Sequence, residues 1–171
     1  VKEGYPLFFP APLLSDPFVY DDQWRGTGAD GVFYGFDTKP IWSDSSRQIL
    51  QLQQDSLKIQ GIPVSTAPLL SLSHYPSVLL RDSTGFFRKD IYAMVSESGS
   101  VFLYTDEANL IANFAMGQSA TSHSNLHIID MDGDNNLDIG LAGNFGRLFA
   151  WTIITQERLF DLPTASIRYP I

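Results

Sequence analysis

Residues 130–138 read Asp-Met-Asp-Gly-Asp-Asn-Asn-Leu-Asp, with apolar, glycine-punctuated segments on both sides. Four carboxylates, those of Asp130, Asp132, Asp134 and Asp138, fall at relative positions 1, 3, 5 and 9 of this stretch. The first three alternate, so an extended loop could turn them toward one point, and the fourth would close the ring from the far side. Such crowded negative charges repel one another unless a cation lies among them.

Oxygen ligands of this kind suit a hard cation, calcium above all. We therefore predict a Ca2+ site at Asp130, Asp132, Asp134 and Asp138, with Asn136 contributing its backbone carbonyl oxygen. The ion would hold the turn rather than perform chemistry, because no residue nearby resembles a catalytic partner. The alternative is an acidic surface turn that binds nothing, since solvated charge runs are common.

The acidic stretch is not an EF-hand loop, although it carries similar ligands. The last ligand position of an EF-hand loop is a bidentate glutamate, and the residue there is Leu141. The flanking segments predict strands rather than helices, because residues 126–129, 139–141 and 148–151 are apolar and are separated by glycines. The order is strand, loop, strand, turn, strand.

The composition favours a folded β-rich chain and disfavours some partners. The chain has 171 residues, no cysteine, 44% hydrophobic residues, 13% aromatic residues and a net charge of −8. The negative net charge disfavours nucleic acid as a partner, because phosphates are bound by clustered Lys and Arg. No apolar run approaches the roughly 20 residues of a membrane-spanning helix. Because the sequence starts at Val1, we expect a processed product or a piece of a longer protein, and the lack of cysteine is compatible with export.

The acidic stretch has a degenerate counterpart earlier in the chain. Setting residues 82–104 beside residues 130–151 aligns Asp82, Gly85 and Asp90 with the first, fourth and ninth positions of the stretch, at a shift of 48 residues. After one inserted residue, Val-Phe-Leu-Tyr at 101–104 aligns with Leu-Phe-Ala-Trp at 148–151. Threonine and phenylalanine replace two of the acidic residues in this copy, so it is predicted to be structural only. A third, weaker copy lies at the N-terminus.

Each copy has the same plan of short apolar strands separated by an acidic loop or by glycine-containing turns. Fourth strands are expected at 39–42, 110–114 and 158–160. Repeats of about 40–50 residues with four short strands are typical of β-propeller blades, so we predict an all-β, propeller-type fold that is a segment of a larger propeller. The predicted units are a degenerate blade at 1–44, an insertion or linker with a hairpin at 45–65, a degenerate blade at 66–117, a calcium-loop blade at 118–160 and an extended tail at 161–171.

Residues 130–142, followed by Gly-Arg-Leu-Phe-Ala-Trp at 146–151, resemble the FG-GAP/VCBS repeat family. The match is good over 126–152, degenerate in the middle copy and weak in the first. The glycine that usually follows the third aspartate is Asn135 here. The resemblance implies an integrin-α-like propeller with calcium at one blade. It does not imply one activity, because such folds host many functions.

Two other motifs are weaker. Residues 26–31 match the Gly-x-Gly-x-x-Gly spacing of dinucleotide sites, but an apolar, strand-like segment follows them where a helix is needed. A turn between strands is therefore the preferred interpretation. His123 and His127 would form a metal pair on a helix, yet they lie in loop-like and strand-like sequence, so separate histidines are favoured.

The predicted function is that of a calcium-stabilised scaffold, adhesion or assembly module of an exported, periplasmic or cell-surface protein. Its partners would be a protein or glycan ligand, other copies of the chain, or the rest of a larger propeller. Trp24, Trp42 and Trp151 could stack on sugar, although core packing is the preferred interpretation. The alternative is a non-catalytic part of a carbohydrate-active or quinoprotein-like enzyme, since no catalytic set is visible in this sequence.

Overall fold

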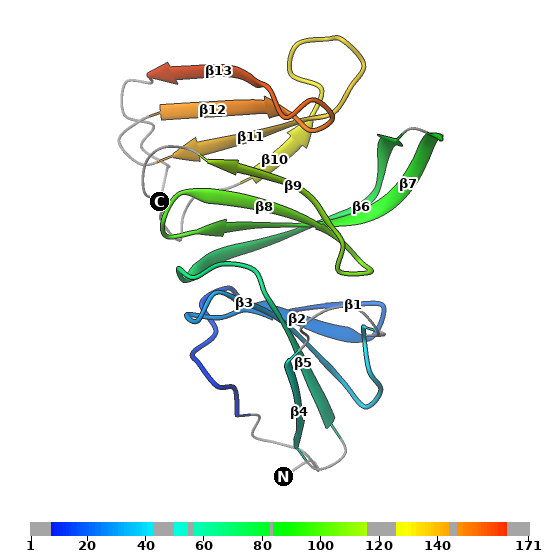
Figure 1. Cartoon of the computed structure of the whole chain (residues 1–171), viewed down its shortest axis with the longest axis vertical. Coiled ribbons are helices and arrows are strands. Elements are labelled where there is room, and N and C mark those ends of the chain that lie inside the picture. The colour runs from blue at the N-terminus through cyan, green and yellow to red at the C-terminus, as the bar shows by residue number, and fades with distance from the viewer. Residues whose placement is uncertain are drawn as a thin grey trace.

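The computed structural model describes residues 8–42, 50–54, 57–82, 84–115, 126–143 and 147–163. Over these residues the chain is all-β, with thirteen strands in three antiparallel sheets, and this confirms the predicted class. The sheets follow one another along the longest axis of the molecule, from the N-terminal sheet at the bottom of Figure 1 to the C-terminal sheet at the top. None of the three closes on itself. The described residues include no helix that could cross a membrane.

The first sheet has five strands in the order β1-β2-β3-β5-β4. Their bounds are β1 Phe18–Tyr20, β2 Gln23–Thr27, β3 Val32–Asp37, β4 Leu50–Gln54 and β5 Leu57–Pro63. The hairpin predicted in the 45–65 segment is present as β4 and β5. Because β5 pairs directly with β3, this hairpin continues the first sheet. The fourth strand expected at 39–42 is absent, since those residues form bends and irregular backbone.

The second and third sheets are four-stranded meanders, each in simple sequence order. The second comprises β6 Leu69–Asp82, β7 Gly85–Ser96, β8 Ser100–Thr105 and β9 Leu110–Ala115. The third comprises β10 Leu126–Ile129, β11 Asp138–Gly143, β12 Arg147–Thr152 and β13 Arg158–Pro163. The fourth strands expected at 110–114 and 158–160 are therefore both present. The limits of the predicted units remain predictions, and residues 164–171 of the expected tail lie outside the described part of the chain.

The second sheet is covered on both faces, which explains why residues 91–95 of β7 and 101–104 of β8 are apolar at every position. In β7, Ile91, Ala93 and Val95 belong to a core shared with the third sheet. The intervening residues Tyr92 and Met94 belong to a core shared with the first sheet. Alternate side chains of a strand point to opposite faces, and strands buried on both faces have near-continuous hydrophobic sequences.

The strand registers correct the predicted alignment of the repeats. Ile91 pairs with Thr105 in the second sheet, and Asp138 pairs with Thr152 in the third. Tyr92 of the second sheet packs toward the sheet before it, as Ile139 of the third does. The differences 138 − 91 and 152 − 105 both equal 47, so pairing and side-chain direction together make Ile91 the structural counterpart of Asp138. The predicted match of Asp90 to Asp138 at a shift of 48 is therefore wrong by one residue.

The second sheet also lacks a loop equivalent to the acidic stretch. Instead, β6 and β7 pair with each other beyond the part of β7 that pairs with β8. They form a long hairpin there, visible as the curled green ribbon at the right of Figure 1. Asp82 pairs with Gly85 at the tip of that hairpin. The predicted equivalence of these two residues with the first and fourth positions of the acidic stretch is therefore also wrong, because a hairpin occupies the place of the loop.

The glycine motif at 26–31 spans the end of β2 and the turn that joins β2 to β3. A strand follows the motif, as the sequence indicated, so the helix that a dinucleotide site requires is not there. Gly31 has a φ of +76°. Its carbonyl oxygen accepts hydrogen bonds from the backbone N–H groups of Val64 (3.0 Å) and Ser65 (3.1 Å), which attach the turn to the segment leading into β6.

Candidate metal centre

The acidic stretch forms the loop between β10 and β11 of the third sheet. Ile129 pairs with Asp138, so the sheet holds the two ends of the loop together. Within it, Gly133 and Asn135 have φ values of +82° and +67°. Glycine and asparagine are the residues that adopt this left-handed backbone at least cost, and these two positions let the chain fold back over a short distance.

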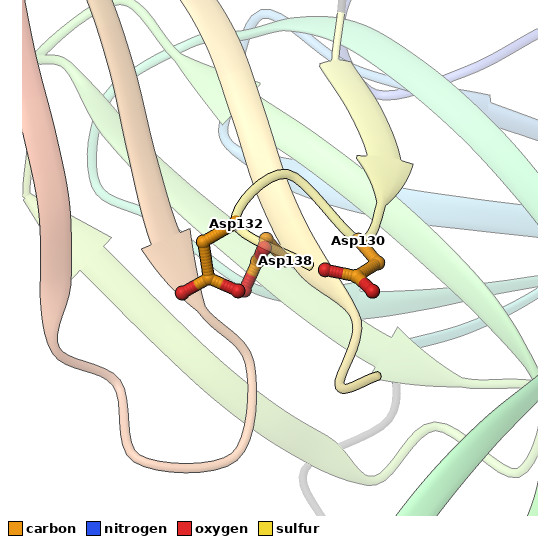
Figure 2. Close-up of side chains that lie close together, drawn as sticks. All are labelled: Asp130, Asp132 and Asp138. Atoms are coloured by element: carbon orange, nitrogen blue, oxygen red, sulfur yellow. The ribbon is translucent and has the colours of Figure 1, made fainter. Parts of the chain in front are cut away.

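Three of the predicted ligands are brought together by this loop. Carboxylate oxygens of Asp130, Asp132 and Asp138 all lie within 4.8 Å of one another. Figure 2 shows the three side chains converging, with Asp130 on one side of the loop and Asp132 and Asp138 on the other. Asp130 and Asp132 are exposed, whereas Asp138 is buried. A hard cation could reach the group from solvent and contact all three.

Backbone N–H groups of the loop hold the two exposed carboxylates in place. Asp130 accepts hydrogen bonds from the N–H of Gly133 (2.7 Å, Oδ1) and from the N–H of Asn135 (3.0 Å, Oδ2). Asp132 Oδ1 accepts one from the N–H of Asp134 (3.1 Å). These bonds wrap the loop around the carboxylates, so the acidic side chains organise the backbone as well as gathering charge.

Asp138 provides the strongest indication of a cation. Its side chain is 0% exposed, and Oδ2 accepts a 2.7 Å hydrogen bond from the backbone N–H of Met131. Its Oδ1 is also buried but has no hydrogen-bond partner among the described residues. Burial raises the pKa of Asp138, the hydrogen bond from Met131 opposes this, and the carboxylates of Asp132, Asp134 and Asp130 add to the rise. Buried polar atoms are rarely left unpaired, so a metal ion bound by this oxygen would fit the site.

The other two predicted ligands contact each other. Asp134 Oδ1 accepts a hydrogen bond from the backbone N–H of Asn136 (2.7 Å), and Oδ2 accepts one from the Asn136 side-chain amide (2.7 Å). The side-chain bond, followed by the backbone bond, lowers the pKa of Asp134. The structure therefore does not bring Asp134 into the group of three, and its place among the ligands stays a prediction, as does that of the Asn136 carbonyl.

The remaining candidates lie apart from this loop. Trp42 and Trp151 are buried in the cores between sheets, in keeping with the packing interpretation. Trp24 is 36% exposed and stacks on Phe36. His127 lies in β10, and His123 falls outside the described residues.

Arg25, a buried cation in β2, was not among the residues predicted from the sequence. Nothing in a single arginine of a short strand indicates burial, so only the structure could identify it.

No protein-family model matches this chain, and no curated protein matches it.

Proposed function

We propose that the chain is a calcium-stabilised segment of a β-propeller that serves as a scaffold, adhesion or assembly module in an exported or cell-surface protein. Calcium would bind at the loop between β10 and β11. The role would be structural: the ion holds the loop, and the stacked sheets present their turns to a protein or glycan partner.

The stacking of the sheets supports the propeller. Three successive sheets pack face to face, and two of them are four-stranded meanders, as in propeller blades. Figure 1 shows the same order along the chain and along the molecule. A propeller closes only when further blades are added, because three blades are too few to form a ring.

The outer face of the third sheet offers a place for such an addition. Phe149 and Trp151 point into the core shared with the second sheet, so Leu148, which is half-buried, lies on the opposite, outer face. Leu162, which pairs with Leu148, is 51% exposed. A further blade from the same protein would bury this face as the third sheet buries one face of the second.

The unpaired Oδ1 of Asp138 is the single observation that carries the calcium proposal. A buried carboxylate oxygen is costly without a partner, and two more carboxylates stand within reach of the same point. Binding by a few oxygens of a surface loop suits the millimolar calcium found outside cells, where modules bind with dissociation constants of about 10⁻⁴–10⁻³ M. The proposed exported location follows from this requirement.

Thermal unfolding with calcium and with a chelator tests the proposal. Because an ion that binds only the folded state stabilises it by mass action, a concentration of about 100 times Kd should add about 2.7 kcal/mol. For a chain of this size each kcal/mol raises the Tm by about 2–4 °C. Asp132→Asn should abolish the calcium-dependent rise, whereas Asp16→Asn, the same change at an exposed residue outside the loop, should leave it intact.

Equal melting curves in calcium and chelator for the unmodified chain would contradict the calcium site. The module role needs its own measurement, which is binding of the chain to a glycan array and to candidate protein partners in calcium. Specific binding without turnover of the bound molecule would support the module, and turnover by the chain itself would contradict it.

A further inference from the structure

A pocket of about 420 Å³ lies between the second and third sheets. Apolar side chains from both sheets dominate its lining, namely those of Leu80, Phe87, Ile111, Ile153 and Ile154. Leu80 and Ile153 are buried, whereas Ile154 is 40% exposed, so the lining runs from the shared core to the surface. The volume falls within the roughly 300–1,000 Å³ of pockets that enclose small molecules, and a mostly apolar lining is typical of such pockets.

Two hydrogen-bonded turns hold the walls of this pocket in shape. In the turn between β8 and β9, the backbone N–H of Asn109 donates to Oγ1 of Thr105 (3.1 Å), and the N–H of Thr105 donates to the carbonyl oxygen of Asn109 (2.8 Å). In the turn between β12 and β13, the N–H of Gln156 donates to the carbonyl oxygen of Thr152 (3.0 Å). These bonds form the walls before a ligand arrives, which lowers the cost of binding.

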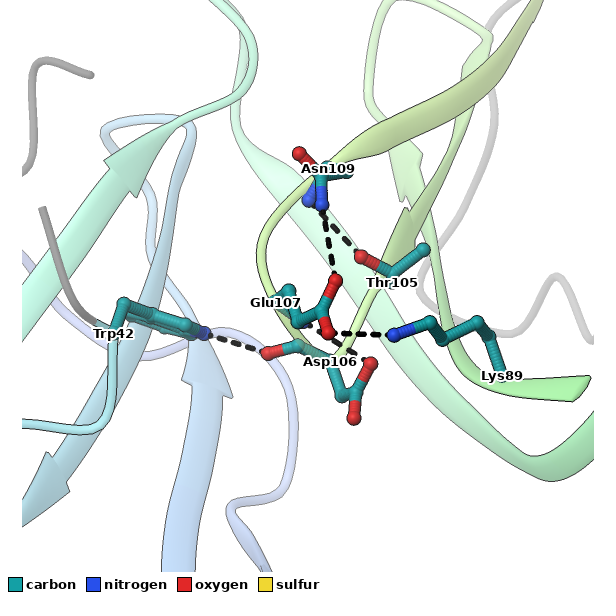
Figure 3. Close-up of polar contacts among 6 residues, drawn as sticks. All are labelled: Trp42, Lys89, Thr105, Asp106, Glu107 and Asn109. Atoms are coloured by element: carbon teal, nitrogen blue, oxygen red, sulfur yellow. Dashed lines mark hydrogen bonds and ion pairs between the residues drawn. The ribbon is translucent and has the colours of Figure 1, made fainter. Parts of the chain in front are cut away.

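One wall of the pocket is polar and accessible to solvent. Figure 3 shows this wall: Lys89 pairs with Glu107 (2.5 Å), and the side-chain amide of Asn109 donates to the same carboxylate (3.4 Å). The side chain of Lys89 is 31% exposed and that of Glu107 is 59% exposed, so a ligand atom can reach both. Because an ammonium group has three N–H donors and a carboxylate has about four acceptor sites, each group can add a hydrogen bond while the pair stays intact.

The charges of this wall select the head group of a ligand. An ammonium group placed there would meet Lys89, and a carboxylate would meet Glu107, so an ion of either sign lies close to a like charge. The net charge of −8 adds to the repulsion of an anion. A hydroxyl group avoids both conflicts, because it can accept a hydrogen bond from Lys89 and donate one to Glu107.

We propose that this pocket binds a small neutral alcohol, with its apolar body between the two sheets and its hydroxyl group on Lys89 and Glu107. A sugar fits less well, because several of its hydroxyl groups would lie against apolar side chains without hydrogen-bond partners. The ligand is therefore a mostly apolar molecule with one polar end. None of the three carboxylates of the acidic loop lines the pocket, so the proposal does not rest on the calcium site.

Titration of the whole isotope-labelled chain, followed by nuclear magnetic resonance, tests the proposal. The probes are phenethyl alcohol and cyclohexylethanol, each compared with the ammonium and carboxylate compounds that carry the same ring. At least one alcohol should bind with a Kd of about 10 mM or below, as a modest affinity per atom gives for about nine non-hydrogen atoms. It should shift the backbone amide signals of Ile154, Gln156 and Glu107, and its two charged counterparts should bind at least about threefold more weakly.

Calcium is kept at one concentration throughout, because the N–H of Ile153 donates to the carbonyl oxygen of Leu137 in the acidic loop (3.2 Å) and so links the pocket wall to that loop. Three outcomes overturn the proposal: neither alcohol binds at up to about 30 mM, a charged counterpart binds as tightly as its alcohol, or the shifted signals lie only outside the pocket.

Two substitutions on the polar wall connect the selectivity to these side chains. Lys89→Met removes the ammonium group and keeps the apolar stem, so phenethylammonium should bind at least about threefold more tightly and phenethyl alcohol more weakly. Glu107→Gln should favour phenylacetate in the same way. Both variants should fold, because an exposed ion pair contributes little to stability. The matched controls are Lys58→Met and Glu97→Gln, at exposed residues outside the pocket. An unchanged order of affinities in both pocket variants overturns the proposal.

Discussion

Asp138, the first residue of β11, accepts a 2.7 Å hydrogen bond from the backbone N–H of Met131, the second residue of the acidic loop. One oxygen of this carboxylate therefore holds the end of the loop to its beginning. Since the second oxygen is buried without a partner, the same side chain stabilises the backbone and leaves a strong acceptor for a cation.

Asp138→Asn should have opposite effects with and without calcium. The amide oxygen can keep the bond to Met131, and the change removes a buried charge that Asp130 and Asp132 repel. In chelator the variant should therefore unfold at the same temperature as the unmodified chain or at a higher one. In calcium it should unfold at a lower temperature, because a ligand is lost. Differential scanning calorimetry in the two buffers measures both, and a variant less stable in chelator would contradict this account.

Gly31→Ala should destabilise the fold more than Gly133→Ala. Both glycines have a positive φ, +76° and +82°, so a side chain strains the backbone similarly, by about 1–2 kcal/mol. At Gly31 a Cβ would also lie 1.9 Å from the carbonyl oxygen of Ser65, whereas at Gly133 it meets nothing within 4 Å. We expect a loss of about 3 kcal/mol or more at Gly31. Urea unfolding in chelator compares the two, and equal losses would refute the steric explanation.

Leu103→Ala should loosen the packing between the second and third sheets. Leu103 is 0% exposed and belongs to the core that these sheets share. Truncating a buried leucine leaves a cavity and costs about 2–5 kcal/mol. Leu110→Ala, on the neighbouring strand at 53% exposure, is the control and should cost about 0.5 kcal/mol. Chemical denaturation gives both values, and similar losses would show that the two sheets do not pack as described.

Asp90 should make the chain sensitive to acid. Burial works to raise its pKa, but hydrogen bonds from Tyr20, the Ser77 backbone (2.8 Å) and His74 (3.2 Å) outweigh burial and hold the pKa below its ordinary value. A depressed pKa means that the carboxylate stabilises the fold above its unfolded pKa of about 3.9 and that this stability is lost as the pH falls through the folded pKa.

The measurement is urea unfolding at neutral pH and at about pH 3. Asp90→Asn should lower stability at neutral pH and should lose less than the unmodified chain on acidification. Glu157→Gln, at an exposed carboxylate in the turn between β12 and β13, serves as the control and should behave like the unmodified chain. An equal acid loss in the Asp90 variant would contradict the role assigned to its hydrogen bonds.

The strands were predictable from the sequence because their side-chain patterns are local. The continuous apolar segments at 91–95 and 101–104 are strands with two buried faces. The register between copies was predictable for 101–104 and 148–151, whose aromatic patterns match, but not around Asp90 and Asp138, because matching acidic and glycine residues does not reveal which residues pair across a sheet. The hairpin tip at Asp82 and Gly85 resembles a degenerate loop in sequence, and only the pairing of β6 with β7 distinguishes the two.

The candidate site was predictable in composition but not in side-chain direction. The alternation of Asp130, Asp132 and Asp134 indicated three carboxylates on one side of an extended loop. The left-handed backbone at Gly133, between Asp132 and Asp134, ends that alternation, and Asp134 contacts Asn136 instead. The burial of Asp138 depends on the strands around it, and that of Arg25 depends on aromatic residues distant in sequence, so neither can be inferred from nearby residues.

Phe102 and Leu103 are adjacent in β8, yet one packs toward the first sheet and the other toward the third. Deleting either the first or the third sheet would therefore expose a large hydrophobic face of the second sheet to water. Fragments that end at residue 115, or that begin at residue 69, should form insoluble aggregates when they are expressed. The smallest soluble fragment should contain all three sheets.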